Sequence, residues 1–477
     1  MVTRRSFIKT AGAAAAALAV EGMESPIKAF TARTSANPVS GAGGKVNVAL
    51  IGIGFRGAED EDGIAKTGLA NVVALCDVDM GAEHTLKVMN KYPKAKKYKD
   101  FRKMFDEMGK EIEAVVVAVP DFAHFPIAMR AIKEGIHVYC EKPLTRTFFE
   151  NELLLQAAKM HPNVVTQMGN QGHSEGNYFQ FKAWKEAGII KDVTEITAHM
   201  NNDRRWHPWD PNISRYPEAE PIPSTLDWDL WHMSQIYHEY SDRYHRGNWR
   251  CWYDFGMGAL GDWGAHLIDT AHEFLDLGLP YEVELLRADG WNNFFFPMSS
   301  TIKFRFPRRG DMPSCDITWY DGLDNIPEVP AGYGTSEISS DVPTVNGGML
   351  KPSKLNPGKI IYSKDLIFKG GSHGSTLSII PEEAAKDMAN KLPEVPKSPS
   401  DHYTNFLNAC MGKEKTRSRF EVAVPLCQVF NLGVIAQRLG HGFKFDRNTK
   451  EIIGDPFASA LLAGNPPRKG WEDYYKL

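Results

Sequence analysis

The sequence predicts an α/β protein in two parts, a doubly wound parallel sheet followed by an α+β domain with a large, mostly antiparallel sheet. Between residues 45 and 140, short apolar runs alternate with stretches of helical period, which is typical of a parallel sheet covered by helices. Beyond residue 165, strand-like segments follow one another without intervening helices, which favours an antiparallel sheet. We therefore place the first domain at 37–165 and the second at 166–477.

The apolar runs of the first domain are expected to be buried parallel strands, because such strands are covered on both faces and read as continuous hydrophobic segments. The expected strands lie at 45–51, 71–76, 114–119 and 137–140. The helical stretches lie at 82–91, 100–108 and 123–134. Alternation of this kind predicts right-handed crossovers and a doubly wound sheet.

The second domain is expected to contain six strands and several helices. The strands lie at 193–200, 282–290, 299–306, 314–320, 359–368 and 375–380. The helices lie at 175–187, 259–275, 401–412 and 421–439. A stretch rich in proline, glycine and serine at 321–357 predicts a long surface excursion.

The composition is that of an ordinary folded protein. The chain has 477 residues, of which 43% are hydrophobic and 24% charged, so intrinsic disorder is excluded. Lys and Arg number 55 against 59 Asp and Glu, and no basic block occurs, so charge gives no reason to expect a nucleic acid or an anionic membrane as partner. The six cysteines show no CxxC pair and no metal-ligand spacing, which predicts buried thiols, no disulfide framework and no metal site.

The N-terminus carries the pattern of an export signal. Paired arginines, Arg4 and Arg5, precede a mildly apolar, alanine-rich run, which resembles a twin-arginine signal. The run is too short to span a bilayer, which takes about 20 residues. We expect residues 1–36 to be removed after export of the folded protein to the periplasm, with no stable membrane anchor. Cleavage after Ala36 fits best, and Ala29 and Ala32 are alternatives.

The first strand ends in a glycine-rich loop with the spacing GxGxxG, and a helix follows it. A dinucleotide-binding Rossmann domain has this arrangement: the first glycine makes a tight turn, the second lets a pyrophosphate approach, and the third permits close helix packing. Asp77 ends the second strand, where a carboxylate accepts ribose hydroxyls and repels a 2′-phosphate, so NAD is favoured over NADP. The loop residues expected to bind the cofactor are Gly52, Gly54, Phe55, Arg56 and Gly57, with the Arg56 side chain either on the pyrophosphate or in solvent.

Polar residues follow the next two strands, at the edge where an open α/β sheet binds its ligand. A lysine placed beside a bound nicotinamide can orient and polarise a substrate hydroxyl. We expect the cofactor to be contacted here by Pro120, Asp121, His124, Glu141 and Lys142, together with Asn170 at the end of the domain.

These motifs resemble those of the Gfo/Idh/MocA family, which includes glucose-fructose oxidoreductase and inositol dehydrogenase. The resemblance rests on the glycine loop, Asp77, the sequence Glu-Lys-Pro at Lys142, and an Asp-x-x-x-His motif at Asp262 and His266. It implies that Lys142, Asp262 and His266 are catalytic, with Lys142 binding the reacting hydroxyl and His266 taking its proton. Because Asp262 and His266 are four residues apart on an expected helix, the carboxylate can also tune the imidazole.

The segment 204–252 concentrates Trp, Tyr, His and Arg residues. Aromatic faces with polar tips suit a sugar, which offers apolar C–H faces and a rim of hydroxyls, although many of these residues must be packing residues. We expect His245, Trp249 and Arg250 to bind substrate, because they lie nearest the Asp-x-x-x-His motif in the sequence. His173, near the interdomain junction, either touches the substrate or braces the junction, and Asn170 has the same two alternatives.

The expected function is that of an NAD-dependent oxidoreductase, which moves hydride between a tightly bound nicotinamide and a carbinol carbon of a sugar, glycoside or cyclic polyol. Free NAD is scarce outside the cytoplasm, so an exported enzyme would carry its cofactor out already bound. The alternative is a redox-neutral, NAD-dependent glycoside-cleaving enzyme that acts through a transient keto-sugar. A cofactor-binding sensor without catalysis is disfavoured by the presence of Lys142, Asp262 and His266. The resemblance also implies a homo-oligomer, either a dimer or a tetramer.

Overall fold

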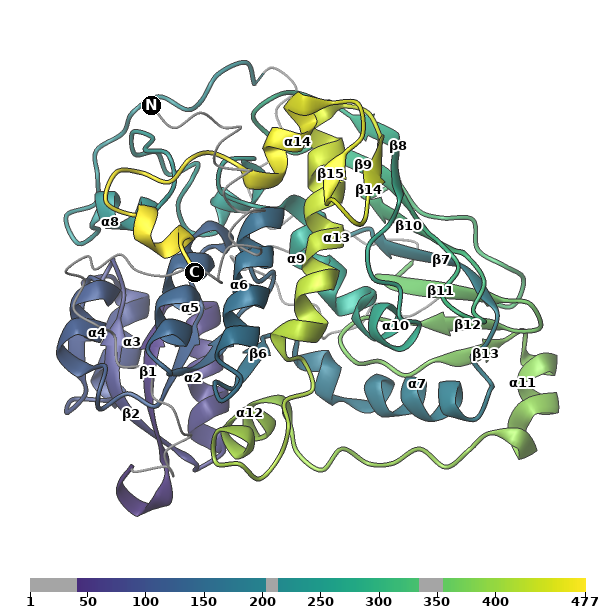
Figure 1. Ribbon diagram of the computed structural model, residues 1–477, viewed down its shortest axis with the longest axis horizontal. Coiled ribbons are helices and arrows are strands. Elements are labelled where there is room, and N and C mark those ends of the chain that lie inside the picture. Colours follow the sequence, from purple (N-terminus) through teal and green to yellow (C-terminus); the bar gives the residue numbers. More distant parts are fainter. Residues whose placement is uncertain (1–40, 203–212, 334–354) are drawn as a thin grey trace, which may run out of the picture.

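The computed structural model describes residues 41–202, 213–333 and 355–477. The proposed signal at 1–36 lies outside the described residues, as does part of the aromatic segment. Two sheets lie side by side, with the N-terminal part on the left of Figure 1 and the C-terminal sheet on the right.

The first sheet has six parallel strands in the order β3-β2-β1-β4-β5-β6. Their bounds are β1 Val46–Ile51, β2 Ala70–Cys76, β3 Lys96–Tyr98, β4 Ala114–Val117, β5 His137–Cys140 and β6 Thr166–Met168. This order confirms the doubly wound sheet. The strand order reverses between β1 and β4, which is where such sheets open a crevice for a ligand. Since β6 pairs with β5, the sheet extends three residues beyond the boundary expected at residue 165.

Helices cover both faces of this sheet. They are α2 Arg56–Lys66, α3 Glu83–Lys91, α4 Phe101–Met108, α5 His124–Lys133 and α6 Phe148–Met160. A helix from late in the chain, α12 His402–Cys410, joins α2 and α3, and its Phe406 and Leu407 pack with Val48 and Leu50 of β1. A segment within the range expected for the second domain therefore packs on the first sheet, before β14 and β15 complete the second sheet.

The second sheet has nine strands in the order β13-β12-β11-β7-β10-β9-β8-β14-β15. Their bounds are β7 Val193–Met200, β8 Glu282–Asp289, β9 Ser299–Phe306, β10 Cys315–Asp321, β11 Gly358–Ser363, β12 Ile367–Gly370, β13 Ser378–Ile380, β14 Phe443–Asp446 and β15 Glu451–Ile452. Among the described pairs only β7 and β10 run parallel, which confirms the mostly antiparallel sheet. The strand expected at 359–368 is a hairpin of β11 and β12.

The helices of the second part are α7 Gly176–Glu186, α8 Trp228–His232, α9 Gly258–Leu267, α10 Asp269–Phe274, α11 Glu382–Met388, α13 Phe420–Leu439 and α14 Pro456–Ala463. Short 3-10 turns are η1 Ala42–Gly44, η2 Asp121–Ala123, η3 Gln171–Ser174, η4 Asn248–Cys251, η6 Ala389–Lys391 and η7 Glu472–Tyr475. The helix expected at 259–275 is divided at Ile268 into α9 and α10.

The central helix α13 stands between the two sheets and contacts α6 on one side and α9, β8 and β9 on the other (Figure 1). It is long and apolar enough to cross a membrane, but 83% of its apolar window is buried inside the protein. Its composition is thus accounted for by packing in the core. All six cysteines are also buried and form no disulfide, as the sequence predicts.

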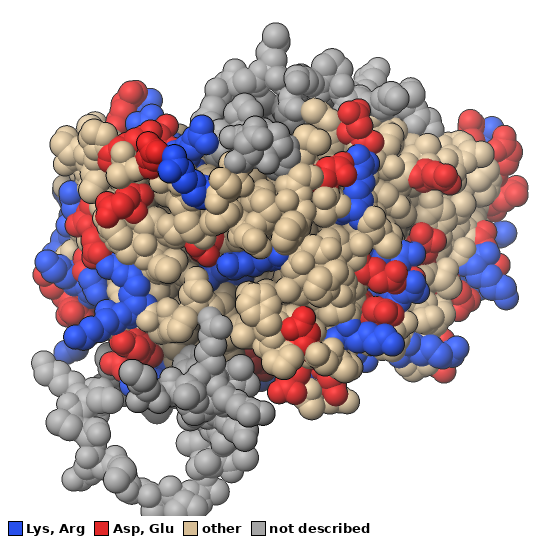
Figure 2. Space-filling model, turned by 90° about the horizontal axis from the view of Figure 1, so that it is seen from above, with Lys and Arg blue, Asp and Glu red and all other residues tan. Residues whose placement is uncertain are grey.

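Charge on the face drawn in Figure 2 is mixed, with Lys and Arg side chains interspersed among Asp and Glu. A surface of mixed sign agrees with the near-neutral balance of the sequence, and this face offers no broad basic area to a nucleic acid.

Two glycines allow α9 to lie against α13. A Cβ atom on Gly264 would be 2.7 Å from Cε1 of Phe430, and one on Gly433 would be 2.5 Å from Cδ2 of Leu260. Both distances are too short for real contacts, so the helices approach closely only because these side chains are absent. Since α9 carries Asp262 and His266, this packing also sets where those two residues lie.

We predict that Gly264→Ala lowers the free energy of unfolding by about 1–3 kcal/mol, because the new methyl group overpacks the contact with Phe430. Denaturant unfolding measures the change. A matched control is Gly68→Asn, where the backbone has a φ of +67° and open space surrounds the Cβ position, so little change is expected. Equal stability of the Gly264→Ala and wild-type proteins would contradict the packing argument.

Candidate active site

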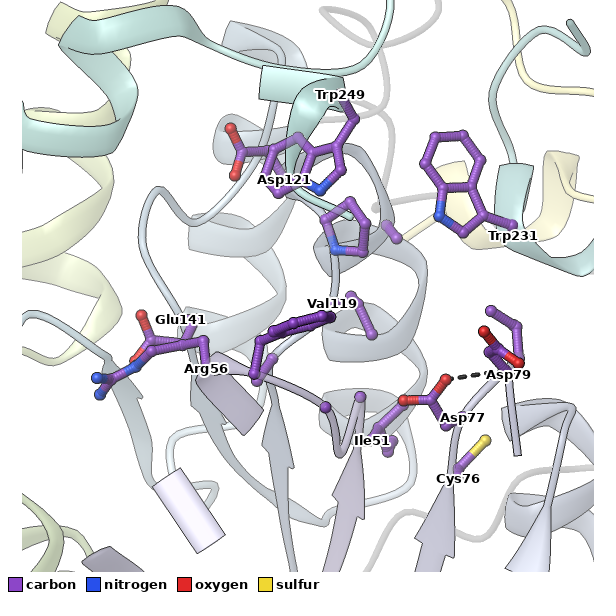
Figure 3. Close-up of a pocket in the computed structure, with 18 of the residues that line it drawn as sticks. Ile51, Arg56, Cys76, Asp77, Asp79, Val119, Asp121, Glu141, Trp231 and Trp249 are labelled. Carbon is purple, nitrogen blue, oxygen red and sulfur yellow. Dashed lines mark hydrogen bonds and ion pairs between the residues drawn. The ribbon is translucent and has the colours of Figure 1, made fainter. Parts of the chain in front are cut away.

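A cavity of about 410 Å³ opens at the carboxyl ends of the first four core strands, where the strand order reverses (Figure 3). Both parts of the chain line it. The first part contributes the glycine loop, the ends of β2 and β4, and Lys142, whereas the second contributes Trp231, Trp249, Arg250 and His266. The crevice predicted for a doubly wound sheet is therefore present, and residues of the second part cover it.

The glycine loop has the backbone that its sequence predicts. Gly52 has a φ of +79°, and a Cβ atom there would lie 2.4 Å from the carbonyl oxygen of Ala118. A Cβ atom on Gly57 would lie 1.9 Å from the carbonyl oxygen of Gly52, so the third glycine does permit close packing of α2. A Cβ atom on Gly54 would meet the ring of His84 at 2.3 Å. His84, which the motif did not indicate, therefore packs against the glycine loop.

Phe55 lies at the outer side of the glycine loop. Its φ is +45°, its side chain is half-exposed, and its ring stacks on His84 with 4.6 Å between centroids. Both rings line the cavity, so they offer an apolar surface beside the glycine loop.

Two carboxylates lie at the end of β2. Asp77 accepts hydrogen bonds from the backbone N–H groups of Ile53 and Asp79, each at 2.9 Å, while burial raises its pKa. Asp79 is also buried, and its Oδ1 has no hydrogen-bond partner among the residues that the structure describes. A buried acceptor without a partner fits a hydroxyl-bearing ligand such as the ribose of NAD.

His245 lies at this same end of the cavity. Burial lowers its pKa, its strongest charged neighbour is Asp79, and its Nδ1 is buried without a hydrogen-bond partner among the described residues. His245 lines the cavity near Asp79, and its contact with substrate stays a prediction. Proximity in sequence to the Asp-x-x-x-His motif did not reveal this position near Asp79, since the chain crosses the cleft between the two.

Lys142 and Asp262 are in contact at the end of the cavity opposite to Asp77 and Asp79. The contact crosses the boundary between the two parts of the chain. Nζ of Lys142 donates to Oδ1 of Asp262 at 3.0 Å and to its carbonyl oxygen at 2.7 Å. Arg250 approaches the same Oδ1 at 3.6 Å, and its guanidinium lies over the Trp249 ring, 4.2 Å from the centroid. The structure therefore unites four residues that the sequence assigned to catalysis or substrate.

Asp121 adds a second carboxylate to this group. Burial raises its pKa to about 7, although Arg250 and Lys142 lower it and Asp262 raises it further. Its side chain lies near Trp249 in Figure 3 and lines the cavity. A carboxyl group that changes charge near neutral pH at the reacting end of a cleft is typical of a functional site.

His266 lines the cavity as the resemblance implies. The carboxylate of Asp262 contacts Lys142 and Arg250, so it holds the lysine. His266 also stacks on His373, a residue of the connection between β12 and β13 that the sequence did not single out.

Arg56 and Glu141 line the cavity but face each other. Nε of Arg56 contacts Oε1 of Glu141 at 3.2 Å, and its Nη2 donates to Asp60 at 2.7 Å and to Tyr403 at 2.8 Å. The two alternatives for Arg56, pyrophosphate or solvent, both stay predictions. The network joins the glycine loop to α12, because Tyr403 belongs to that helix. Pro120 also lines the cavity, at the end of β4.

Five expected site residues do not line the cavity, namely Gly57, His124, Asn170, His173 and Asp262. His124 is buried with its Nδ1 2.8 Å from the carbonyl oxygen of Pro143, so it supports the segment that carries Lys142. Asn170 donates to Oδ2 of Asp269 at 3.0 Å and accepts from Ser418 at 2.6 Å. Both side chains thus have partners within the protein, and their contact with the cofactor stays a prediction.

His173 is likewise a bracing residue. Its two ring nitrogens lie 3.0 Å from Oδ2 of Asp269 and 2.6 Å from Oε2 of Glu273. Burial opposes the charge of His173, but the hydrogen bonds that its ring donates to these two carboxylates raise its pKa to about 9. The alternative in which His173 braces the junction is the one that the structure supports.

Comparison with known proteins agrees with this geometry. A family model described as "Oxidoreductase family, NAD-binding Rossmann fold" matches residues 46–168, which confirms the predicted cofactor domain. The companion model, "Oxidoreductase family, C-terminal alpha/beta domain", matches residues 194–288 and 362–473. Both models are those of Gfo/Idh/MocA proteins, and together they cover more than half of the chain.

Curated relatives match over a limited length. Inositol 2-dehydrogenase of Salmonella typhimurium is 27% identical over 194 residues, which cover 39% of this chain and 54% of the relative. An inositol 2-dehydrogenase/D-chiro-inositol 3-dehydrogenase of Lactiplantibacillus plantarum is 30% identical over 40% of this chain and 53% of its own length. A glycosyl hydrolase family 109 protein of Parabacteroides distasonis is 34% identical over 28% of this chain and 30% of its own length. The chain thus spans about half the length of the inositol dehydrogenases that it matches.

Solved structures share the fold. The WlbA dehydrogenase from Bordetella pertussis, in complex with NADH and UDP-GlcNAcA, gives a TM-score of 0.54 at 13% identity and covers 84% of this chain and 99% of its own. Aldose-aldose oxidoreductase from Caulobacter crescentus, complexed with glycerol, gives a TM-score of 0.52 at 14% identity and covers 84% of this chain and 100% of its own. At such identities the likeness concerns the fold alone.

We predict that the free energy of unfolding of the cofactor-free protein falls as the pH rises from about 4 to 7, because Asp121 loses its proton in this range. In this range the native carboxyl group, with a pKa near 7, keeps a proton that the unfolded chain has released, so deprotonation favours unfolding. The Asp121→Asn variant has no carboxyl group to titrate at this position. Its denaturation midpoint should therefore fall less steeply than that of wild type as the pH rises from about 4 to 7.

Denaturant unfolding at several pH values tests this against the control Asp365→Asn, which changes an exposed carboxylate. A pH slope that is the same in Asp121→Asn and wild type would show that Asp121 does not titrate in this range.

Proposed function

The chain belongs to the Gfo/Idh/MocA oxidoreductase family, and from this premise we propose that it is an NAD-dependent oxidoreductase acting on a carbinol carbon of a sugar, glycoside or cyclic polyol. The observation that carries the proposal is the contact of Lys142 with Asp262, which places an ammonium group in the cavity beyond the glycine loop. An alcohol substrate needs such a cation for its oxygen and a base for its proton.

The residues would divide the chemistry as follows. Lys142, held by Asp262, binds the hydroxyl oxygen, and His266 accepts the hydroxyl proton. When bound, NAD supplies the nicotinamide that takes the hydride from the carbinol carbon. The glycine loop, Asp77 and Asp79 would hold the cofactor, since they form the turn and the buried acceptors at the opposite end of the cavity.

A polyhydroxylated substrate suits the reacting end. Arg250, stacked on Trp249, presents hydrogen-bond donors beside an aromatic face, which is the combination that a sugar ring requires. The relatives named as inositol dehydrogenases support a cyclic polyol or sugar as the substrate class.

The cofactor would be retained between turnovers, because later parts of the chain cover the ribose end. Backbone N–H of Asp227 donates to the carbonyl oxygen of Val78 at 2.9 Å, and Lys99 donates to the carbonyl oxygen of Thr225 at 3.1 Å. Trp471 of the C-terminal segment packs against Phe101, with 5.9 Å between ring centroids. Release of a dinucleotide would require these contacts to open.

Redox-neutral glycoside cleavage is the second candidate. It is favoured by the similarity to the glycosyl hydrolase family 109 protein and by the covered cofactor end, since a retained cofactor can return its hydride to the same substrate. Oxidation to a keto-sugar acidifies the neighbouring C–H bond, elimination expels the glycosidic group, water adds to the resulting double bond, and reduction regenerates the alcohol.

The test begins with purified full-length protein. Mass spectrometry of the denatured protein should detect co-released NAD, and a panel of myo-inositol, D-glucose, D-xylose and aryl glucosides should then be assayed. Net reduction of the nicotinamide, or a keto-sugar product, supports the oxidoreductase. Release of a phenol without net reduction supports cleavage. Absence of both dinucleotide binding and turnover would refute the proposed function.

We predict that Lys142→Ala keeps its cofactor but lowers kcat/KM about 100-fold or more, which is the usual size of a lost acid–base contribution. Steady-state kinetics on the substrate found by the panel measure the loss, with co-released NAD as the control for folding. A wild-type rate in Lys142→Ala would remove Lys142 from the mechanism.

We also propose export of the folded, cofactor-loaded protein to the periplasm through the twin-arginine signal, which contains Arg4 and Arg5. Replacement of both arginines by lysine is expected to leave the protein in the cytoplasm, as cell fractionation would show. Equal periplasmic amounts of the variant and the wild-type protein would contradict a twin-arginine route.

A homo-oligomer, dimer or tetramer, remains part of the proposal. Large apolar side chains are exposed around β8 and the turn after it, namely Tyr281, Leu286, Trp291 and Met298. Contact between copies of this surface would bury them. Light scattering of the purified protein gives the number of subunits.

A further inference from the structure

A second imidazole lies against the expected proton acceptor. The rings of His266 and His373 are stacked, with 3.9 Å between centroids and 20° between planes, and both line the cavity. The Trp263 ring meets His373 edge-on, with 5.3 Å between centroids. The backbone N–H of His373 also donates to the carbonyl oxygen of His266 at 3.1 Å. Ring and backbone of His373 thus both contact α9.

His373 comes from a connection that belongs to the far sheet. The connecting segment runs from the end of β12 at Gly370 to the start of β13 at Ser378 and reaches back to the cavity. His373 has a φ of +51°, a left-handed conformation that costs a side-chain-bearing residue of order 1–3 kcal/mol and persists only where its surroundings hold it. Asn or Gly would form the same turn more easily. An imidazole here therefore has a role beyond closing a hairpin.

The surroundings hold this segment from two sides. The N–H of Asn177, in the first turn of α7, donates to the carbonyl oxygen of Gly374 at 2.9 Å. A Cβ atom on Gly172 would lie 2.6 Å from the backbone nitrogen of Gly374 and 2.7 Å from the carbonyl carbon of His373. The segment can lie this close to η3 only because residue 172 has no side chain. Ser372 Oγ, 2.9 Å from Nδ1 of His373, fixes the ring itself.

We propose that His373 is a positioning residue for His266, which it holds by stacking so that the His266 imidazole keeps the plane needed to accept the substrate proton. The inference rests on the proposed function, because it concerns the same proton transfer. An acceptor must lie within hydrogen-bond reach of the hydroxyl in a defined orientation, and displacement of about 1 Å can lower a rate about 100-fold. Stacking restricts ring rotation without occupying the reacting edge.

Two substitutions separate stacking from the turn. His373→Asn keeps a polar residue that tolerates the left-handed backbone but removes the stacked ring. It should lower kcat about 10- to 100-fold with little change in KM. His373→Phe keeps a flat ring and should restore kcat to within about threefold of wild type, since stacking is retained. The exposed His441→Asn is the matched control and should behave as wild type.

Gly172→Ala tests the same role without altering either histidine. The added methyl group must push the segment away from η3, so the variant should reproduce the kcat loss of His373→Asn. Thermal unfolding and co-released NAD report whether each variant is folded and loaded. A folded His373→Asn protein with wild-type kcat would overturn the inference, and so would a His373→Phe protein as slow as His373→Asn.

A measurement without substrate distinguishes this inference from the proposed function. In protein with 13C-labelled histidine, the His266 ring resonance should move when the stacked ring is removed in His373→Asn, because a neighbouring ring current is lost. An unchanged resonance would overturn the stack. If the resonance moves but no sugar is turned over by wild type, the stack stands and the proposed function fails, together with the positioning role assigned to His373.

Discussion

The contact of Lys142 with Asp262 is the interaction on which the site depends. It joins the residue that follows β5 to helix α9 of the second part, and both side chains are nearly buried, at 10% and 4% exposure. A buried ion pair adds little net stability, because desolvation of both charges offsets their attraction. Its evident contribution is geometric: it keeps an ammonium group in the cavity at a fixed place between the two sheets, with Arg250 and Asp121 beside it.

The rest of the fold keeps that contact in place. Glycine contacts set α9 against α13, α13 packs on α6 of the first part, and α12 returns to cover the first sheet. Residues expected at the ligand serve this framework. His124 supports the segment after Lys142, whereas Asn170 and His173 converge on Asp269. The hydrogen bonds of these buried side chains fix the junction between the parts.

Prediction from sequence succeeded where a local rule applies. The turn at Gly52, the tight packing at Gly57 and the acidic end of β2 follow from backbone requirements within one β-α-β unit. It could not indicate which residues lie close together in space when they are far apart in the sequence. His245 and Arg250 are five residues apart, yet one lies beside Asp79 and the other beside Asp262. His373 was overlooked although glycines surround it in the sequence, and Trp471 carries no motif that could have indicated its place beside Phe101.

The sequence by itself determined the class of the fold, the glycine loop, the choice of NAD and the identities of Lys142, Asp262 and His266. These features depend on short-range periodicity, on backbone conformations that only glycine adopts readily, and on motifs that keep their spacing. Only the tertiary structure decided the partners of those residues and of the cavity rim: that the Asp262 carboxylate holds Lys142, that His266 stacks on His373, and that Asp227 and Trp471 pack against Val78 and Phe101. Such contacts join residues more than a hundred positions apart, and their geometry arises from helix and sheet packing that no local pattern encodes.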